Sequence, residues 1–251
     1  TTISRTLPSL PMSTRSDWLH SLLRLLFRER CAVCDAELSA GERTICTLCR
    51  ATAPLTGYWT QADNPIWRRC RELLPVHRAS GFLFFRQGSG WQRLIHGFKY
   101  RGAWRTARTL GEWYGRELKA SGLYNDVDAV IPLPLHPLKR LRRGYNQSEY
   151  IAEGIAAQLG IPVDRTSVYR SRNTAEQALR SRRERAGNVE GAFAVRHPDR
   201  LAGRHVLLTD DVMTTGSTLL ACVEAILAAA PDCRISIAAL AVVHHEWGMK
   251  E

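Results

Sequence analysis

Apolar residues recur along residues 77–243 in two kinds of run that alternate with each other. Short runs that are almost wholly apolar are typical of buried strands, and longer runs with one apolar stripe are typical of helices. The strand candidates are 77–87, 127–133, 163–169, 191–195, 205–209 and 234–243, and the helix candidates are 104–118, 146–159 and 217–229. This alternation predicts an α/β domain with a mostly parallel sheet flanked by helices.

The N-terminal part of the chain follows a different pattern. Residues 1–14 combine two prolines with several hydroxyl side chains, which is typical of a loose tail. Residues 16–30 place apolar side chains on a wide helical face bordered by arginines, which predicts an amphipathic helix. Residues 54–75 look irregular, so we place the domain boundary there. The expected division is 1–74 for tail, helix and cysteine unit, and 75–251 for the α/β domain.

Four cysteines stand in two Cys-x-x-Cys pairs separated by eleven residues: Cys31, Cys34, Cys46 and Cys49. Zinc takes four thiolates in a tetrahedron, and two such pairs deliver two thiolates each from tight turns. The spacing therefore predicts a small zinc-binding unit, structural because four cysteines leave no open position on the metal. Four reduced, buried cysteines are the alternative. Cys70 lacks a partner two residues away and is a weaker candidate.

Composition narrows the class of protein. Among 251 residues, 45% are hydrophobic and 24% charged, as in ordinary globular proteins, which excludes wholesale disorder and fibrous repeats. Lys+Arg exceed Asp+Glu by 35 − 24 = 11, which points to anionic partners such as nucleic acid, phosphorylated molecules or an anionic membrane surface. No apolar stretch is long enough to span a membrane, and no secretory signal is evident. We expect a protein of the reducing cytoplasm, with at most weak association with the inner face of the membrane.

The most informative segment is 206–218. An apolar strand leads into Asp210 and Asp211, followed by a turn rich in hydroxyl groups and an apolar-striped helix. Backbone N–H groups at a helix start, joined by hydroxyls, can bind a phosphate, and glycine permits close approach. The residues of this predicted phosphate loop are Thr214, Thr215, Gly216, Ser217 and Thr218. The two acids suit paired sugar hydroxyls or a Mg²⁺-bound ligand, so a ribose 5-phosphate fits both halves. An ordinary strand–turn–helix with capping residues is the alternative.

The segment 206–218 resembles the signature of type I phosphoribosyltransferases, and further stretches are similar to the competence ComF family. The matching stretches are Ile131–Pro134, Arg142–Gln147, Thr174-x-x-Gln177, Arg185-x-x-Asn188 and Gly191–Phe193, together with the four-cysteine unit. The resemblance covers the chain from about Cys31 onward. Tyr145 replaces the commoner Phe, and the family often has a further cysteine pair where this chain has only Cys70.

The resemblance implies binding of phosphoribosyl pyrophosphate with Mg²⁺. Residues 136–185 contain 11 Lys/Arg and 5 Asp/Glu, and a basic loop after the first core strand would hold the pyrophosphate. A further loop, 172–188, would close over the substrate through Thr174, Gln177, Arg185 and Asn188. The implied catalytic residues are Asp210, Asp211, Lys139 and Arg143.

Two functions remain open at this point. The first is Mg²⁺-dependent phosphoribosyl transfer to an unidentified acceptor, which the basic loop and the closing loop favour. The second, implied by the family's association with natural transformation, is a non-catalytic ribose-phosphate sensor or a handler of single-stranded DNA among competence-machinery proteins. His244 and His245 follow the last strand, where similar enzymes cover the acceptor, but the sequence does not identify that acceptor.

Overall fold

The computed structural model describes residues 29–98, 103–171 and 191–243. Most of the predicted N-terminal helix lies outside these residues, as do Thr174, Gln177, Arg185, Asn188 and the His244–His245 pair. The chain divides into two compact units, Thr1–Ala51 and Thr52–Glu251. Each unit is described by itself below.

The second unit is built on a four-stranded sheet in which every neighbouring pair is parallel. Its strand order is β1 (Arg78–Phe85), β6 (Arg234–Val243), β5 (His205–Met213) and β2 (Ala129–Pro132). β3 (Val168–Arg170) and β4 (Phe193–Val195) form a separate antiparallel pair. The predicted mostly parallel α/β sheet is confirmed.

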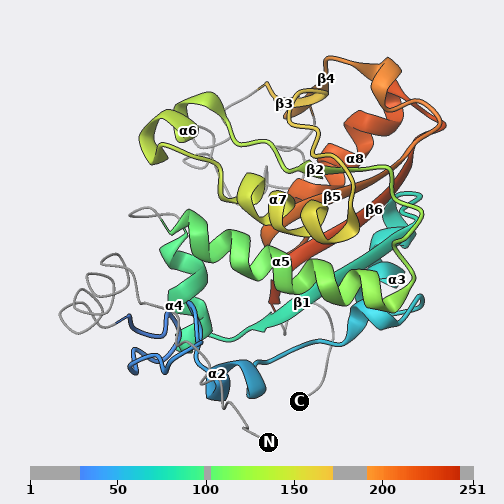
Figure 1. Cartoon of the computed structure of the whole chain (residues 1–251). Helices are drawn as coiled ribbons and strands as arrows, with labels where there is room; N and C mark the ends of the chain where they lie inside the picture. Colours follow the sequence, from blue (N-terminus) through green and yellow to red (C-terminus); the bar gives the residue numbers. More distant parts are fainter. Residues whose placement is uncertain (1–28, 99–102, 172–190, 244–251) are drawn as a thin grey trace, which may run out of the picture. The chain divides into compact units, whose positions relative to one another are not determined.

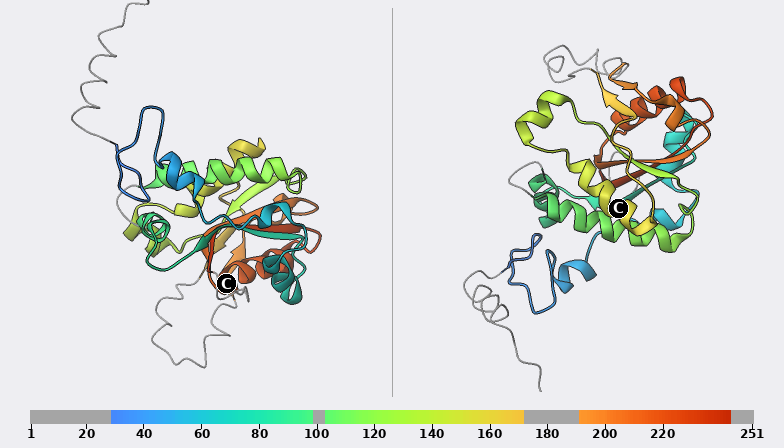
Figure 2. Two further views of the ribbon diagram at one scale, coloured as in Figure 1. Left: turned by 90° about the horizontal axis from the view of Figure 1, so that it is seen from below. Right: turned by 45° about the horizontal axis from the view of Figure 1, so that its top comes forward.

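Helices cover both faces of the sheet (Figure 1). α5 (Trp104–Ser121) and α7 (Gln147–Leu159) lie on one face, and α3 (Pro65–Leu73) and α8 (Ser217–Ala229) on the other. Figure 2 shows the same layers from two further sides. One core cluster joins α3, α8 and alternate residues of the inner strands, including Ile66, Val223, Leu208 and Ile237. The central strands are therefore buried on both faces, which explains why β6 reads as an almost continuous apolar run.

The remaining described elements are short. They are α2 (Thr47–Ala51) in the first unit, and η1 (Tyr58–Thr60), α4 (Gly90–Gly97), α6 (Pro137–Arg143) and η4 (Pro198–Arg200) in the second. α6 lies where the sequence predicts a basic loop, so the prediction of a loop at these residues is wrong. Pro137 opens this helix and Gly144, with φ 80°, ends it in a left-handed conformation. Within the described ranges, no helix has the length and hydrophobicity of a membrane span.

α5 and α7 approach each other so closely that their backbones are in contact. Glycines line this contact from both sides: a Cβ on Gly154 would lie 2.5 Å from the Glu112 nitrogen and 2.7 Å from the Gly111 carbonyl carbon. A Cβ on Gly115 would lie 2.8 Å from the Ile155 Cα. Real side chains do not tolerate such distances, so these glycines set the position of α7 on α5.

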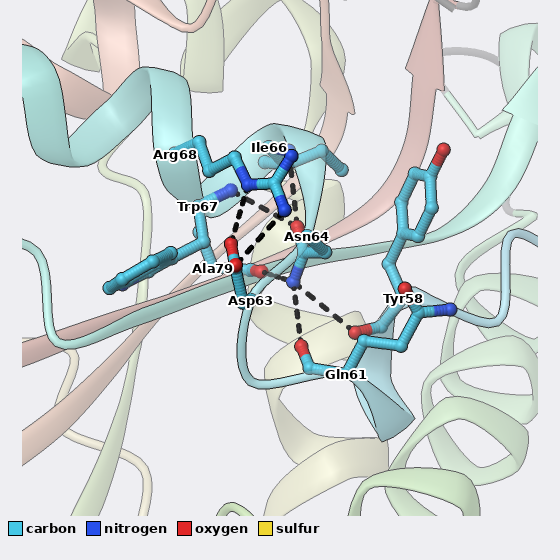
Figure 3. A network of polar contacts seen from close by, with 8 residues as sticks. All are labelled: Tyr58, Gln61, Asp63, Asn64, Ile66, Trp67, Arg68 and Ala79. Atoms are coloured by element: carbon cyan, nitrogen blue, oxygen red, sulfur yellow. Dashed lines mark hydrogen bonds and ion pairs between the residues drawn. The ribbon is translucent and has the colours of Figure 1, made fainter.

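Residues 52–74 are packed on the sheet by the buried side chain of Asn64 (Figure 3). Its Oδ1 accepts hydrogen bonds from the backbone N–H of Ile66 and Trp67, which caps α3. Its Nδ2 donates to the carbonyl of Ala79 on β1, 2.8 Å away, and to that of Gln61. The sequence predicts an irregular segment here, with the domain boundary after residue 74. In the structure, residues 52–74 contain η1 and α3 and belong to the second compact unit.

We expect Asn64→Ala to destabilise the second unit by about 2–3 kcal/mol. The change removes a helix cap and leaves the Ala79 carbonyl without its side-chain donor. Urea denaturation, monitored by circular dichroism, measures the loss of unfolding free energy. Arg68→Ala is the matched control, because Arg68 makes an exposed ion pair with Asp63 in the same network (Figure 3) and should matter little. Equal stability of both variants and wild type would contradict this role of Asn64.

Candidate functional site

The two predicted acids lie on β5, near the carboxyl edge of the sheet. The strand predicted over 205–209 is longer in the structure, because β5 continues to Met213 and so includes both Asp210 and Asp211. Asp210 stands opposite Ala239 in the parallel register with β6. Each acid also binds the local backbone: the N–H of Asp211 donates to Asp210 Oδ1, and that of Val212 to Asp211 Oδ1, both at 2.9 Å. The carboxylates are therefore held in place before any ligand binds.

Two side chains at the start of α7 donate hydrogen bonds to the acid pair. Gln147 Nε2 donates to Asp211 Oδ2 at 3.1 Å, and Ser148 Oγ donates to Asp210 Oδ1 at 3.0 Å. Asn146 caps α7 and donates to the Leu133 carbonyl just after β2, so the helix start is fixed to the sheet edge. Asp211 is only 6% exposed. The Arg142–Gln147 motif and the two acids, distant in sequence, thus form one site.

Burial, together with the neighbouring Asp211 carboxylate, raises the pKa of Asp210 well above its ordinary range. Two adjacent carboxylates repel each other, and partial removal from water strengthens that repulsion. The hydrogen bond from Ser148 and the backbone bond from Asp211 act in the opposite direction. The pair is therefore suited to a ligand that supplies positive charge or hydroxyl donors.

The basic segment reaches this pair through Arg143. Its guanidinium donates to Gln147 Oε1 at 3.4 Å, and the same glutamine donates to Asp211. Lys139 lies four residues earlier on α6, on the same helix face as Arg143. Arg140 is engaged elsewhere, in a two-bond ion pair with Glu149. Arg143 is thus connected to the acids through Gln147.

The predicted phosphate loop joins β5 to α8. Gly216 has φ 79°, in the left-handed region, and is the residue before the first turn of α8. Thr215 Oγ1 donates to Ser217 Oγ at 3.1 Å, and Thr214, Thr215 and Ser217 are exposed. No acidic residue stands in the first turn of α8. The loop therefore presents hydroxyls and backbone N–H groups at the positive end of a 13-residue helix, which favours an anion.

Sequence reasoning missed three residues at the site. Gln147 and Ser148 belong to or adjoin the Arg142–Gln147 motif, and the motif was the available signal for them. Arg170, on β3, comes close enough for the Asp210 charge to raise its pKa, although burial lowers that pKa more. No spacing rule indicates Arg170, because its strand reaches the site only through the fold. Thr174, Gln177 and Arg185 lie outside the described residues.

The four cysteines of the first unit come together as predicted. Their sulfurs all lie within 4.8 Å of one another, and the Cys34 and Cys46 sulfurs are 3.8 Å apart. Four sulfurs around a zinc at about 2.3 Å are separated by about 3.8 Å, so the cluster has the size of a tetrahedral zinc site. The N–H of Cys46 donates to the Cys31 sulfur at 3.3 Å, as backbone amides do to metal thiolates. The cluster can hold zinc.

The charges of the cysteine cluster favour a bound cation. Burial raises the pKa of Cys31, but hydrogen bonds from the backbone N–H of Cys46, Cys34 and Val33 outweigh it and bring that pKa to about 6. Burial and the other three cysteines raise the pKa of Cys49. Thiolates this close repel one another, and a bound divalent metal removes the repulsion.

The chain is similar to known proteins in one domain and to several relatives over most of their length. Residues 146–251 match the model of the phosphoribosyl transferase domain, so the fold and the β5–α8 segment define a phosphoribosyltransferase-like protein. DNA utilization protein YhgH of Shigella flexneri is 29% identical over 211 residues, which cover 75% of this chain and 86% of the relative. Competence protein F of Haemophilus influenzae is 34% identical over 130 residues, 50% of this chain and 57% of the relative. The chain is therefore similar to relatives named for DNA utilization and competence, and it carries the four-cysteine cluster in addition.

Two solved structures match part of the chain. The glutamine phosphoribosylpyrophosphate amidotransferase from B. subtilis, complexed with ADP and GMP, matches 58% of this chain with 17% identity and a TM-score of 0.41. The chain covers only 30% of that amidotransferase. Adenine phosphoribosyltransferase from Leishmania donovani matches 63% of this chain with 14% identity and a TM-score of 0.33.

Proposed function

We propose that the second unit binds phosphoribosyl pyrophosphate together with Mg²⁺. The observation that carries this proposal is the adjacency of two opposite kinds of site on one strand–loop–helix segment. Asp210 and Asp211 offer fixed carboxylate oxygens, and residues 214–218 offer hydroxyls and N–H groups to an anion. A sugar phosphate is a ligand that needs both, hydroxyls on the acids and phosphate at the helix start.

In this proposal, different residues bind different parts of the ligand. Asp210 and Asp211 bind the ribose hydroxyls, with Gln147 and Ser148 holding the two carboxylates in orientation. Arg143, and Lys139 on the same face of α6, meet the pyrophosphate and stabilise the charge that develops on it as it leaves. Carboxylate oxygens and ligand phosphates are the donors that Mg²⁺ prefers, so the site fits that ion, which would neutralise phosphate charge.

Asp211→Asn should weaken phosphoribosyl pyrophosphate binding by about ten- to a hundredfold. The change keeps the size of the side chain but removes a charge-assisted hydrogen bond worth about 1.5–3 kcal/mol. Isothermal calorimetry of the full chain with Mg²⁺ measures the difference. Asp199→Asn is the control, since Asp199 is an exposed aspartate on η4 and its variant should bind like wild type. Equal binding by Asp211→Asn and wild type, or no binding by wild type, would overturn the proposal.

We further propose a role in the handling of DNA during natural transformation, which the names of the relatives support. Competence protein F and DNA utilization protein YhgH are named for such processes. Single-stranded DNA and competence-machinery proteins are the proposed partners, and the formal charge of +11 suits the former. Whether the domain transfers the phosphoribosyl group or only senses the ligand is decided by pyrophosphate release. Release on addition of DNA or free bases supports transfer, whereas binding without release supports a sensor.

A further inference from the structure

Three side chains gather at the amino edge of the sheet, where the strands begin. His77 precedes β1, His205 is the first residue of β5, and Asp126 lies between α5 and β2. One potential metal-ligand atom from each lies within 4.8 Å of the others. The two imidazole rings are nearly perpendicular, at 88°, with their centroids 4.9 Å apart. Asp210 and Asp211 lie five and six residues further along the same strand as His205, toward its other end.

One ring nitrogen of each histidine is buried without a hydrogen bond. Neither His205 Nδ1 nor His77 Nε2 has a hydrogen-bond partner among the residues that the structure describes. His205 Nδ1 is 3.2 Å from Asp126 Oδ2, an ion pair when the imidazole is protonated. Two ligands of one tetrahedral zinc, each about 2.0–2.1 Å from it, stand about 3.3 Å apart. The distance between the two atoms is therefore compatible with two ligands of one metal.

The surroundings hold these side chains in the way that metal ligands are held. His205 is fully buried, and its other nitrogen, Nε2, is 2.8 Å from the hydroxyl of Ser236, which fixes the ring. The backbone N–H of His205 donates to Asp128 at 2.8 Å. The backbone of His77 is fixed twice, by its N–H to Ile235 and by the Trp67 indole to its carbonyl.

Positive charge also lies beside the cluster. Arg234, the first residue of β6, has its guanidinium 3.2 Å from the same Asp126 oxygen. A carboxylate has about four acceptor sites, so it can accept this arginine and still bind an ion. Hydrogen-bonded partners of this kind are typical around ligating carboxylates.

We propose that His77, Asp126 and His205 form a binding site for a divalent transition metal of the Zn²⁺ type. Two imidazoles and one carboxylate match the donors that such ions prefer. Three protein ligands leave one position open for water or a small anion. The site lies at the opposite edge of the sheet from Asp210 and Asp211, and it ties together the starts of β1 and β5 and the segment before β2. It is independent of the proposed function.

Metal analysis of the full chain tests this site. The protein is equilibrated with excess Zn²⁺, freed of unbound metal and assayed for zinc by mass spectrometry. His77→Ala and Asp126→Asn should each hold one zinc per chain less than wild type, and His96→Ala, which changes an exposed histidine of α4, should hold as much as wild type. The difference of one equivalent is the readout, so the result does not depend on whether the cysteines are also loaded.

Cobalt distinguishes the two kinds of site. Co²⁺ bound by cysteine gives intense thiolate-to-metal absorption, and Co²⁺ bound by His and Asp gives only weak visible bands. The protein is first loaded with Zn²⁺ and then stripped of zinc at the His–Asp site alone, so that zinc still fills the cysteine site. Co²⁺ added to this protein should give the weak bands in wild type and no bands in Asp126→Asn. Circular dichroism confirms that each variant is folded. Equal zinc content in wild type and a folded Asp126→Asn variant would overturn the proposal.

Discussion

Cys46→Ser should release one zinc per chain and unfold residues 31–49. Among residues 29–51 of the first unit, the buried hydrophobic side chains are three of the cysteines, with Val33 and Ile45. In such small units the metal supplies the folding free energy, about 10–16 kcal/mol for structural zinc in isolated finger peptides. The non-glycine residues Asp35 and Thr44 also have positive φ, at 62° and 65°, a strain that the closed cluster must maintain.

Zinc content by mass spectrometry and amide hydrogen exchange measure this effect together. Exchange should become fast across residues 31–49 and remain slow in β5 and β6. Cys233→Ala is the control, because Cys233 is a buried cysteine of the second unit outside the cluster. Freshly prepared, reduced wild-type protein with no zinc at the cysteines would refute the zinc assignment.

Gly154→Ala should destabilise the second unit by about 3 kcal/mol or more. The added methyl group would lie 2.5 Å from the Glu112 nitrogen and 2.7 Å from the Gly111 carbonyl carbon. Backbone atoms of a neighbouring helix cannot turn away as a side chain can, so α7 must move off α5. Gly97→Ala makes the same change near the end of α4, where the new Cβ meets nothing within 4 Å.

Urea denaturation of the two alanine variants gives the comparison. Gly97→Ala should leave stability unchanged or raise it slightly, because alanine favours helix over glycine. Gly154→Ala should also weaken phosphoribosyl pyrophosphate binding, since α7 carries Gln147 and Ser148. Similar stabilities for both variants would show that the α5–α7 contact is looser than described.

The long elements of the fold were predictable from the sequence. The predicted ranges 217–229 and 234–243 coincide with α8 and β6. A long apolar stripe or run can be buried in the core in only one secondary structure, so its sequence predicts that structure. The short helices were not predicted. α3 begins with Asn64 and Pro65, a cap signal that was available, whereas the basic residues of α6 have no buried face to show a period.

The candidate site was predictable where one segment forms it. The acids and the hydroxyl loop are contiguous, so their order alone indicated a ligand. Their partners on α7 and the neighbouring Arg170 are brought there by strand order and helix packing, which no local spacing encodes. The same holds for His77, Asp126 and His205, which meet only because parallel strands begin at one edge.

The position of β5 inside the sheet decides which part of the site can adjust to a ligand. β5 is paired with β2 as far as Thr209 and with β6 as far as Met213, so Asp210 and Asp211 lie on a strand that β6 holds along its whole length. α6 buries none of its residues and leaves Leu141 82% exposed. We therefore expect the acids to act as a fixed reference, with ligands of different size accommodated by displacement of α6 and Arg143.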